Sequence, residues 1–171
     1  HYACKYNQKE IVSYLLQIPE CNVNLKTDDS QFTALHFACQ NSDIEIVKIL
    51  VDRKDIKLNE KDINDKTPLV LAIQSKFVDI VSFLINCNGI DLSVPSILLA
   101  ACSPPDSTIN EQTDQINSEI VKILLTKKEI NVNCRTKDKK LTPLHIAALN
   151  NNFETVKVLM RSEKIIRKPH D

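Results

Sequence analysis

Apolar residues in this chain gather in short blocks that alternate with polar stretches at a regular distance. Residues 46–51, Ile-Val-Lys-Ile-Leu-Val, place apolar side chains at the spacing of a helix with one buried face. Related blocks lie at 11–16, 80–85, 120–125 and 155–160. A shorter apolar block that ends in alanine precedes each of them. The pattern therefore predicts about five pairs of helices joined by polar turns.

The shorter blocks are copies of one motif. It reads TALHFA at 33–38 and TPLHIA at 142–147. Further copies are TPLVLA at 67–72, a decayed SILLAA at 96–101 and the HYA that opens the chain. The five alanines are 35, 34, 29 and 46 residues apart, and a period of this size indicates one structural unit that is copied and stacked. A loss of about five residues near Val94 and Pro95 explains the short interval, and eleven extra residues within Ser103–Ser118 explain the long one.

The complete units resemble ankyrin repeats. The resemblance rests on TALHFACQNSDIEIVKILV at 33–51 and TPLHIAALNNNFETVKVLM at 142–160, and it extends over residues 1–162. It implies an all-α fold, an ankyrin-repeat solenoid of stacked helix-turn-helix units with projecting hairpin-like loops. The expected repeats are 1–32, 33–66, 67–93, 94–141 and 142–162, followed by residues 163–171 as a tail or the start of a further unit.

Local signals agree with helices that begin at the motif. Thr33, Thr67 and Thr142 can cap free backbone N–H groups, and Pro68 and Pro143 suit the first turn of a helix. Between its two helices the family usually carries glycine, where this chain has Asn7, Ser42, Lys76 and Asn151. Asparagine tolerates a left-handed backbone better than most residues, so we expect altered turns or strain at the serine and the lysine.

Composition and charge narrow the classes of function. Glycine occurs once and tryptophan not at all, which disfavours glycine-rich phosphate loops. The net charge of zero argues against a nucleic-acid partner, and no stretch of about 20 apolar residues is present for direct membrane insertion. The charge is uneven, because residues 67–119 carry one cationic and six anionic side chains, whereas residues 120–171 carry twelve and five. A partner guided by the basic end would bind more weakly as salt rises.

Histidine is a common catalytic or metal-binding residue, but its placement here indicates a structural role. His1, His36 and His145 share one repeat position. The resemblance implies that this ring forms hydrogen bonds to neighbouring backbone and ties repeats together. His170, in the tail, has no evident partner.

The cysteines also follow the repeat. Cys4, Cys39 and Cys102 share a position that Ile73 and Ala148 occupy in the other copies, so this position favours a small buried apolar group. Equivalent residues should lie one repeat apart, which is too far for a disulfide. The remaining cysteines, Cys21, Cys87 and Cys134, show no C-x-x-C spacing. We interpret all six as reduced thiols, which favours an intracellular, cytoplasmic protein.

No G-x-x-x-x-G-K, G-x-S-x-G or H-E-x-x-H pattern is present. The sequence therefore predicts a protein that is no enzyme and has no cofactor, no metal site and no small-molecule substrate. A protein partner is the remaining expectation, and the resemblance places it on the loop tips and the inner helices. The candidate tip residues are Asp29, Ser30, Phe32, Ile63, Asn64, Lys66, Lys139, Lys140 and Leu141. The candidate inner-helix residues are Gln40, Asn41, Gln74, Ser75, Leu149 and Asn150.

Three of the tip residues, Phe32, Ile63 and Leu141, are apolar, and two interpretations of them stay open. They are either binding anchors or residues that pack against the neighbouring loop. The insertion Ser103–Ser118 is expected to be a mobile polar loop on the side opposite the tips, either without a further role or as a docking element. The lost tip near Val94 and Pro95 should leave a notch in the row of loops.

The leading hypothesis is a protein–protein interaction module or scaffold. A structural spacer or docking subunit within a large intracellular assembly is one alternative, and a regulatory segment of a larger enzyme is another. Met160, Ile165 and Ile166 near the outer side of the last unit, and the missing helix start of the first, lead us to expect further repeats or another domain beside this segment.

Overall fold

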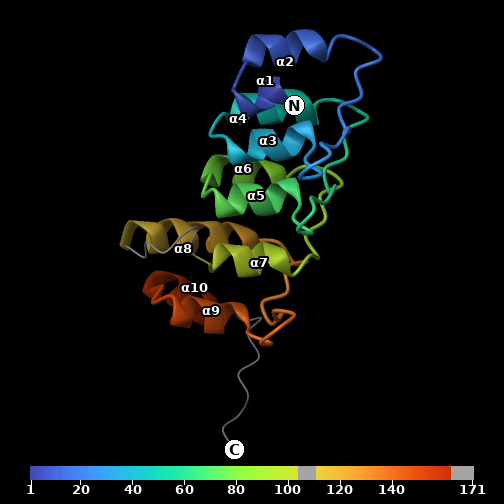
Figure 1. Ribbon diagram of the computed structural model, residues 1–171. Coiled ribbons are helices and arrows are strands. Elements are labelled where there is room, and N and C mark those ends of the chain that lie inside the picture. Colours follow the sequence, from blue (N-terminus) through green and yellow to red (C-terminus); the bar gives the residue numbers. More distant parts are fainter. Residues whose placement is uncertain (104–110, 163–171) are drawn as a thin grey trace, which may run out of the picture. The chain divides into compact units, whose positions relative to one another are not determined.

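The computed structural model describes residues 1–103 and 111–162, and helices are the regular secondary structure found among them. The chain divides into two compact units, residues 1–90 and residues 91–171. Each unit is built from pairs of short helices (Figure 1). The all-α repeat fold expected from the sequence is confirmed.

The first unit holds three helix pairs. They are α1 (Tyr2–Lys5) with α2 (Lys9–Leu15), α3 (Ala34–Gln40) with α4 (Ile44–Val51), and α5 (Pro68–Gln74) with α6 (Val78–Leu84). Helices α1, α3 and α5 pack in one layer and α2, α4 and α6 in a second, with the hairpin-like loops on one side (Figure 1). Because each pair buries its apolar faces against its neighbours, stacking supplies most of the stability.

The first helices begin where the sequence predicts. The hydroxyls of Thr33, Thr67 and Thr142 each accept a hydrogen bond from the N–H three residues ahead. Pro68 and Pro143 occupy the first turn of their helices, where a missing N–H is tolerated. Each threonine cap contributes about 1 kcal/mol to helix stability.

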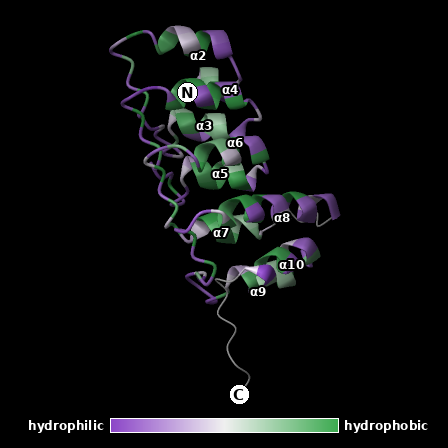
Figure 2. Ribbon diagram, turned by 180° about the vertical axis from the view of Figure 1, so that it is seen from behind, coloured by the Kyte–Doolittle hydropathy of each residue, from purple (hydrophilic) through white to green (hydrophobic). Residues whose placement is uncertain are grey.

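Burial follows the position in the repeat. The first-helix residues Leu35 and Leu69 are fully buried, and hydrophilic residues gather on the hairpins while apolar residues gather on the helices (Figure 2). The first repeat departs from this pattern, because Ile11 is 50% exposed although its equivalent Ile46 is 0% exposed. The outer side of α2 therefore presents apolar residues that the second repeat buries.

Left-handed backbone occurs between paired helices without glycine. Asn7, Lys76 and Asn151 have φ angles of 52°, 63° and 52°. For a lysine this conformation costs roughly 1–2 kcal/mol, so the expected strain is present. The turn at Ser42 is altered instead, because Asn41 before it is extended, with φ −104° and ψ 156°.

The second unit holds two helix pairs in its described residues. They are α7 (Ser96–Ala101) with α8 (Glu111–Leu125) and α9 (Pro143–Leu149) with α10 (Phe153–Arg161). Helix α7 packs against α9, and α8 packs against α10. The chain passes from Ser93 through Val94 and Pro95 directly into α7, which agrees with the predicted loss of a tip.

The insertion differs from the mobile polar loop that the sequence suggested. Residues 111–118 are helical and extend α8 at its N-terminus, while residues 104–110 lie outside the described residues. The carboxylate of Asp114 is buried and accepts hydrogen bonds from the N–H of Glu154 at 2.7 Å and from the N–H and hydroxyl of Thr155 at 3.1 and 2.8 Å. The physical reason for the difference is this cap. The N-terminus of α10 has free N–H groups, and a helical 111–118 segment places the carboxylate of Asp114 where it can accept hydrogen bonds from them.

Candidate partner-binding surface

A hollow of about 540 Å³ lies on the inner face of the first unit. Its lining comes from α1, α3, the first hairpin and the residue after α5. The lining residues are Lys5, Tyr6, Asp29, Ser30, Phe32, Phe37, Gln40, Asn41 and Ser75. Six of them are residues that the sequence predicted, so the structure brings these tip and inner-helix candidates together.

Aromatic rings form the apolar part of this hollow. Phe32 is half-buried, with its ring 5.3 Å from that of His36 and 5.2 Å from that of Phe37, measured between centroids. Both phenylalanines therefore pack within the second repeat and also present an edge to the hollow. Packing inside the protein thus covers part of the Phe32 side chain, and the part that lines the hollow stays accessible to a partner.

Two exposed tyrosines border the hollow, and the sequence prediction missed both. Tyr2 is 75% and Tyr6 61% exposed, and their rings are stacked with centroids 6.3 Å apart. Lys5 Nζ lies 5.8 Å from the centre of the Tyr6 ring. The repeat register could have identified Tyr6, because it occupies the same repeat position as the predicted residues Asn41 and Ser75.

A second hollow of about 450 Å³ adjoins the first and shares Lys5, Asp29 and Phe37 with it. Tyr2 and Asp28 are among its other lining residues. Aromatic faces, two lysines and two carboxylates thus lie on one continuous surface. Such a surface can bury apolar side chains of a partner while polar groups at its border fix the orientation.

Hydrogen bonds already occupy some of the polar lining groups. The N–H of Ser30 donates to the carboxylate of Asp29 at 2.7 Å. This bond, together with the hydroxyls of Thr27 and Ser30, holds the pKa of Asp29 below its usual value. Asn41 Nδ2 donates to the carbonyls of Cys4 at 2.7 Å and of Lys5 at 3.0 Å, so this amide group ties two repeats together.

Four predicted residues of the first unit do not line the hollow: Ile63, Asn64, Lys66 and Gln74. Ile63 is 66% exposed at the next hairpin tip, and its N–H donates to the carbonyl of Ser30 at 3.1 Å. The carbonyl of Lys66 accepts a hydrogen bond from His36 at 3.2 Å, and Asn64 is exposed. Neighbouring tips are therefore linked through their backbones, while the side chain of Ile63 stays available.

The remaining predicted residues belong to the second unit. Lys139 and Lys140 are exposed at a hairpin tip, and Leu141 beside them is half-buried. Leu149 is 71% exposed on α9, and Asn150 Nδ2 donates to the carbonyl of Cys102 at 3.4 Å. These residues belong to the second unit, and their exposed members are two lysines and a leucine, without the aromatic rings of the hollow.

His1 and His36 lie where a structural role predicts, whereas His145 is exposed and accepts a hydrogen bond from the N–H of Thr142 in its own repeat. His36 Nδ1 accepts from the N–H of Thr33 at 3.0 Å, so Nε2 carries the proton and donates to the carbonyl of Lys66. His1 Nε2 lies 2.8 Å from the carbonyl of Leu25. The predicted bonds to neighbouring backbone are thus confirmed for both. His170 lies outside the described residues.

The six cysteines are free thiols. Cys4, Cys39 and Cys102 are buried, as their shared repeat position predicts, and burial raises the pKa of the Cys4 and Cys39 thiols. In residues 1–103 and 111–162, no group of three or more His, Cys, Asp or Glu is arranged to hold a metal ion. None of the helices described is long and apolar enough to cross a membrane.

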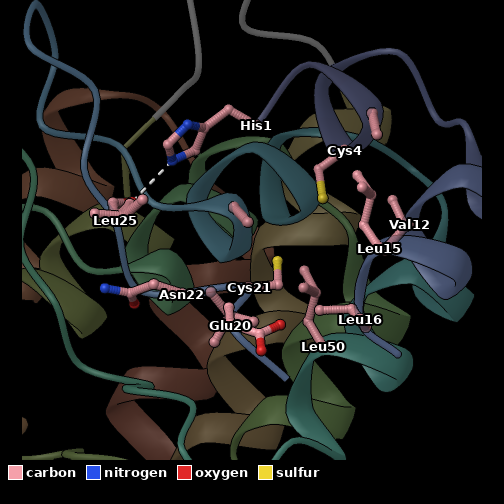
Figure 3. A pocket seen from close by; sticks show the side chains of 13 residues that line it. His1, Cys4, Val12, Leu15, Leu16, Glu20, Cys21, Asn22, Leu25 and Leu50 are labelled. Atoms are coloured by element: carbon pink, nitrogen blue, oxygen red, sulfur yellow. Dashed lines mark hydrogen bonds between the residues drawn. The ribbon is translucent and has the colours of Figure 1, made fainter. Parts of the chain in front are cut away.

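An apolar cavity of about 340 Å³ lies between the first and second repeats, where Cys4 and Cys21 point toward each other across it (Figure 3). His1 lies at one end of the cavity and Leu50 at the other (Figure 3). Because helices of the first two repeats line this cavity, we associate it with repeat packing.

Comparisons with known proteins agree with this architecture. The family model for ankyrin repeats (three copies) matches residues 1–96 and 112–169. The chain is 31% identical to alpha-latrocrustotoxin-Lt1a of Latrodectus tredecimguttatus, over 93% of the chain and 12% of that protein. It is 37% identical to the probable 26S proteasome regulatory subunit p28 of Saccharomyces cerevisiae, over 55% of the chain and 42% of the subunit. It is 29% identical to Rabankyrin-5 of Homo sapiens, over 86% of the chain and 12% of that protein.

The chain thus spans less than half the length of each of these relatives. Ankyrin repeats in general are non-catalytic modules for protein–protein interaction. The matched residues cover most of both units, and the paired helices, threonine caps and hairpins recur in each. This chain belongs to the ankyrin-repeat family.

Proposed function

We propose that this chain is a protein-recognition module and that it binds its partner through the hollow of the first unit and the adjoining tyrosines. One observation carries the proposal: Tyr2 and Tyr6 are stacked, largely exposed and placed beside a hollow lined by Phe32 and Phe37. Tyrosine is enriched at binding hot spots because it offers a large contact area at a low cost in conformational entropy.

The chemistry of the surface favours a partner segment with apolar side chains. Aromatic rings on α1 and α3 would cover these side chains, and Gln40 and Lys5 at the border would form hydrogen bonds to the partner's backbone or carboxylates. As part of the proposal, we place the protein in the cytoplasm, where its buried thiols stay reduced.

The test compares affinity purification by the wild-type chain with that by Tyr2→Ala combined with Tyr6→Ala, using mass spectrometry to identify bound proteins. Tyr14→Ala is the matched control, because Tyr14 is 68% exposed on α2 but lines neither hollow. We expect the double variant to lose its dominant partner and the control to keep it. Unchanged thermal unfolding of both variants would show that the fold is intact.

The opposite result would reject the tyrosine surface. If the double variant and the wild type capture the same proteins, the partner contacts another part of the molecule. The first alternative is docking through the exposed residues of the helical insertion, Glu111, Gln112 and Gln115. Replacing these three by alanine would then abolish capture, which would favour a docking subunit within an assembly.

A further inference from the structure

The hairpin tip of the second unit is a closed turn of four residues. The N–H of Thr136 donates to the carbonyl of Leu141 at 2.9 Å, and the N–H of Leu141 donates to the hydroxyl of Thr136 at 3.0 Å. Between them lie Lys137, Asp138, Lys139 and Lys140, and the last has a left-handed φ of 55°. The two hydrogen bonds hold three lysines on one short, fixed turn.

The first hairpin has the same turn with the opposite charge. The N–H of Thr27 donates to the carbonyl of Phe32 at 2.9 Å, and the N–H of Phe32 donates to the Thr27 hydroxyl at 3.1 Å. The enclosed residues are Asp28, Asp29, Ser30 and Gln31, and the last has a φ of 57°. The shared hydrogen bonds show that the turn does not require lysine. The conformation of the turn therefore does not explain why the second unit carries three lysines there.

The cations around this tip lie at exposed positions. Lys137, Lys139 and Lys140 are exposed, and so is Arg135 before the turn. The single carboxylate, Asp138, bonds within the turn: the N–H of Lys139 and the hydroxyl of Thr136 hold its pKa below the usual value. Over residues 127–140, six cationic side chains stand against two anionic ones. This segment therefore presents a local positive field that screening confines to about 8 Å at physiological salt.

We propose that the tip Lys137–Lys140, together with Arg135, binds an acidic segment of a partner protein. A protein segment fits better than a nucleic acid, because polyphosphate binding requires many cations along the strand. Here the chain as a whole carries 22 cationic and 22 anionic side chains, and the tip with Arg135 supplies four cations in one short segment. This surface shares no residue with the tyrosines and the hollow of the first unit, so the proposal stands independently of the one above.

The test measures binding of a fluorescein-labelled oligoglutamate peptide by fluorescence anisotropy at low salt. The turn of the first hairpin is transplanted by Lys137→Asp, Lys139→Ser and Lys140→Gln, which leaves Asp138 in place and preserves both closing hydrogen bonds. The matched control makes the same change of charge in the second hairpin, with Lys54→Asp, Lys57→Ser and Lys61→Gln, all at exposed lysines. A milder variant, Lys139→Gln with Lys140→Asn, neutralises two charges without adding a carboxylate.

We expect the transplanted turn to weaken peptide binding by roughly tenfold or more, because three exposed charge pairs are lost. The milder variant should weaken binding by a smaller factor, the control should bind nearly as the wild type does, and added salt should weaken wild-type binding. Equal weakening in the control would overturn the proposal, since only total charge would then matter. Failure of the wild type to bind the peptide would overturn it too. Tighter binding of single-stranded DNA of equal charge, in competition with the peptide, would reject an acidic protein segment in favour of a nucleic acid.

Discussion

His36 shows how one side chain holds a repeat together. Its ring accepts a hydrogen bond from the N–H of Thr33 at the start of α3 and donates to the carbonyl of Lys66 at the end of the next hairpin. Burial lowers the pKa of His36, while the bond to Lys66 opposes that shift in part. If Nδ1 were protonated, it would become a donor that faces the N–H donor of Thr33, and the hydrogen bond between them would be lost. The neutral ring is therefore the form that the fold requires.

This requirement predicts a dependence of stability on pH. With a lowered pKa, His36 binds fewer protons in the folded than in the unfolded state, so the free energy of unfolding should decrease as the pH falls below the ordinary value of 6.5. The free energy of unfolding should stop decreasing once the pH is below the pKa that His36 has in the folded state. In the variant His36→Gln this part of the pH dependence should disappear, whereas the exposed His145→Gln should retain it. Urea unfolding across this pH range measures the effect, and identical profiles for all three proteins would contradict it.

Lys76 is strained by its backbone, and the strain predicts the effect of a substitution. The residue has a φ of 63°, which glycine adopts freely. Lys76→Gly removes this strain but adds the conformational entropy that glycine loses on folding, so it should raise the free energy of unfolding by a net of about 0.5–1 kcal/mol. Lys48→Gly, in the interior of α4, should lower it by about 1 kcal/mol, because glycine disfavours a helix. If thermal unfolding shows the two variants shifting in the same direction, the strain at Lys76 is not relieved as expected.

At the scale of elements, the second unit depends on one capping contact. Helix α10 has Asn152 at its N-cap, but the side chain of Asn152 does not cap the helix, and Asp114 from α8 supplies the acceptors instead. Its negative charge also interacts favourably with the N-terminal end of the α10 dipole. The insertion thus stabilises the last repeat by bringing a carboxylate from the preceding one.

Removal of this carboxylate should destabilise the second unit. Asp114→Ala leaves two backbone N–H groups and the Thr155 hydroxyl without their acceptor, at a cost of about 1–3 kcal/mol. Glu119→Ala, at an exposed position of the same helix, should have little effect. Hydrogen exchange of the α10 amides measures the change. Equal protection of these amides in the two variants would show that Asp114 does not stabilise α10.

At the scale of the whole molecule, the proposals assign two surfaces of different physical character. The first unit offers aromatic rings, whose contribution to binding comes from buried area and is nearly independent of salt. The second unit offers lysines on an exposed turn, whose contribution is electrostatic and screened by salt. One chain could therefore engage two segments of a partner, or two partners, by different forces.

This contrast predicts how salt acts on the two interactions. Capture that depends on Tyr2 and Tyr6 should persist when the ionic strength is raised to about 1 M, where the screening length is roughly 3 Å. Binding of an acidic peptide at Lys137–Lys140 should be lost under the same conditions. Affinity purification and anisotropy, each repeated over a salt series, test the two halves separately. Loss of tyrosine-dependent capture in high salt would show that charge, and not apolar contact, maintains that interface.

The sequence predicted the helices, their caps and the repeat family because these depend on local spacing. A threonine before a short apolar block can cap the helix that follows, wherever the repeat lies. The buried cysteine position was found in the same way, by comparing Cys39 with Ile73 and Ala148. For the candidate surface, the repeat register identified six of the nine residues that line the hollow.

The tyrosines were missed because the candidate inner-helix residues were taken from the later repeats, and the first repeat lacks a complete motif. Phe32 and Leu141 were predicted as possible anchors, yet each is half-buried, because a hairpin residue has neighbours that spacing does not reveal. Truncating them would therefore disturb packing as well as any binding. Ile63 is the one member of that group whose side chain is largely exposed.

The sequence by itself determined the unit, its repetition and the charge on each hairpin, since neighbouring residues specify a helix pair and a turn. Only the tertiary structure decided which side chains meet across repeats. Part of an insertion that the sequence suggested as a polar loop is a helix with a buried Asp114. The exposed tyrosines lie beside a hollow that α1, the first hairpin, α3 and the residue after α5 form together. The physical reason is that burial and capping between repeats depend on contacts 30 to 40 residues apart, such as His36 with Lys66 and Asp114 with Glu154, which no local pattern records.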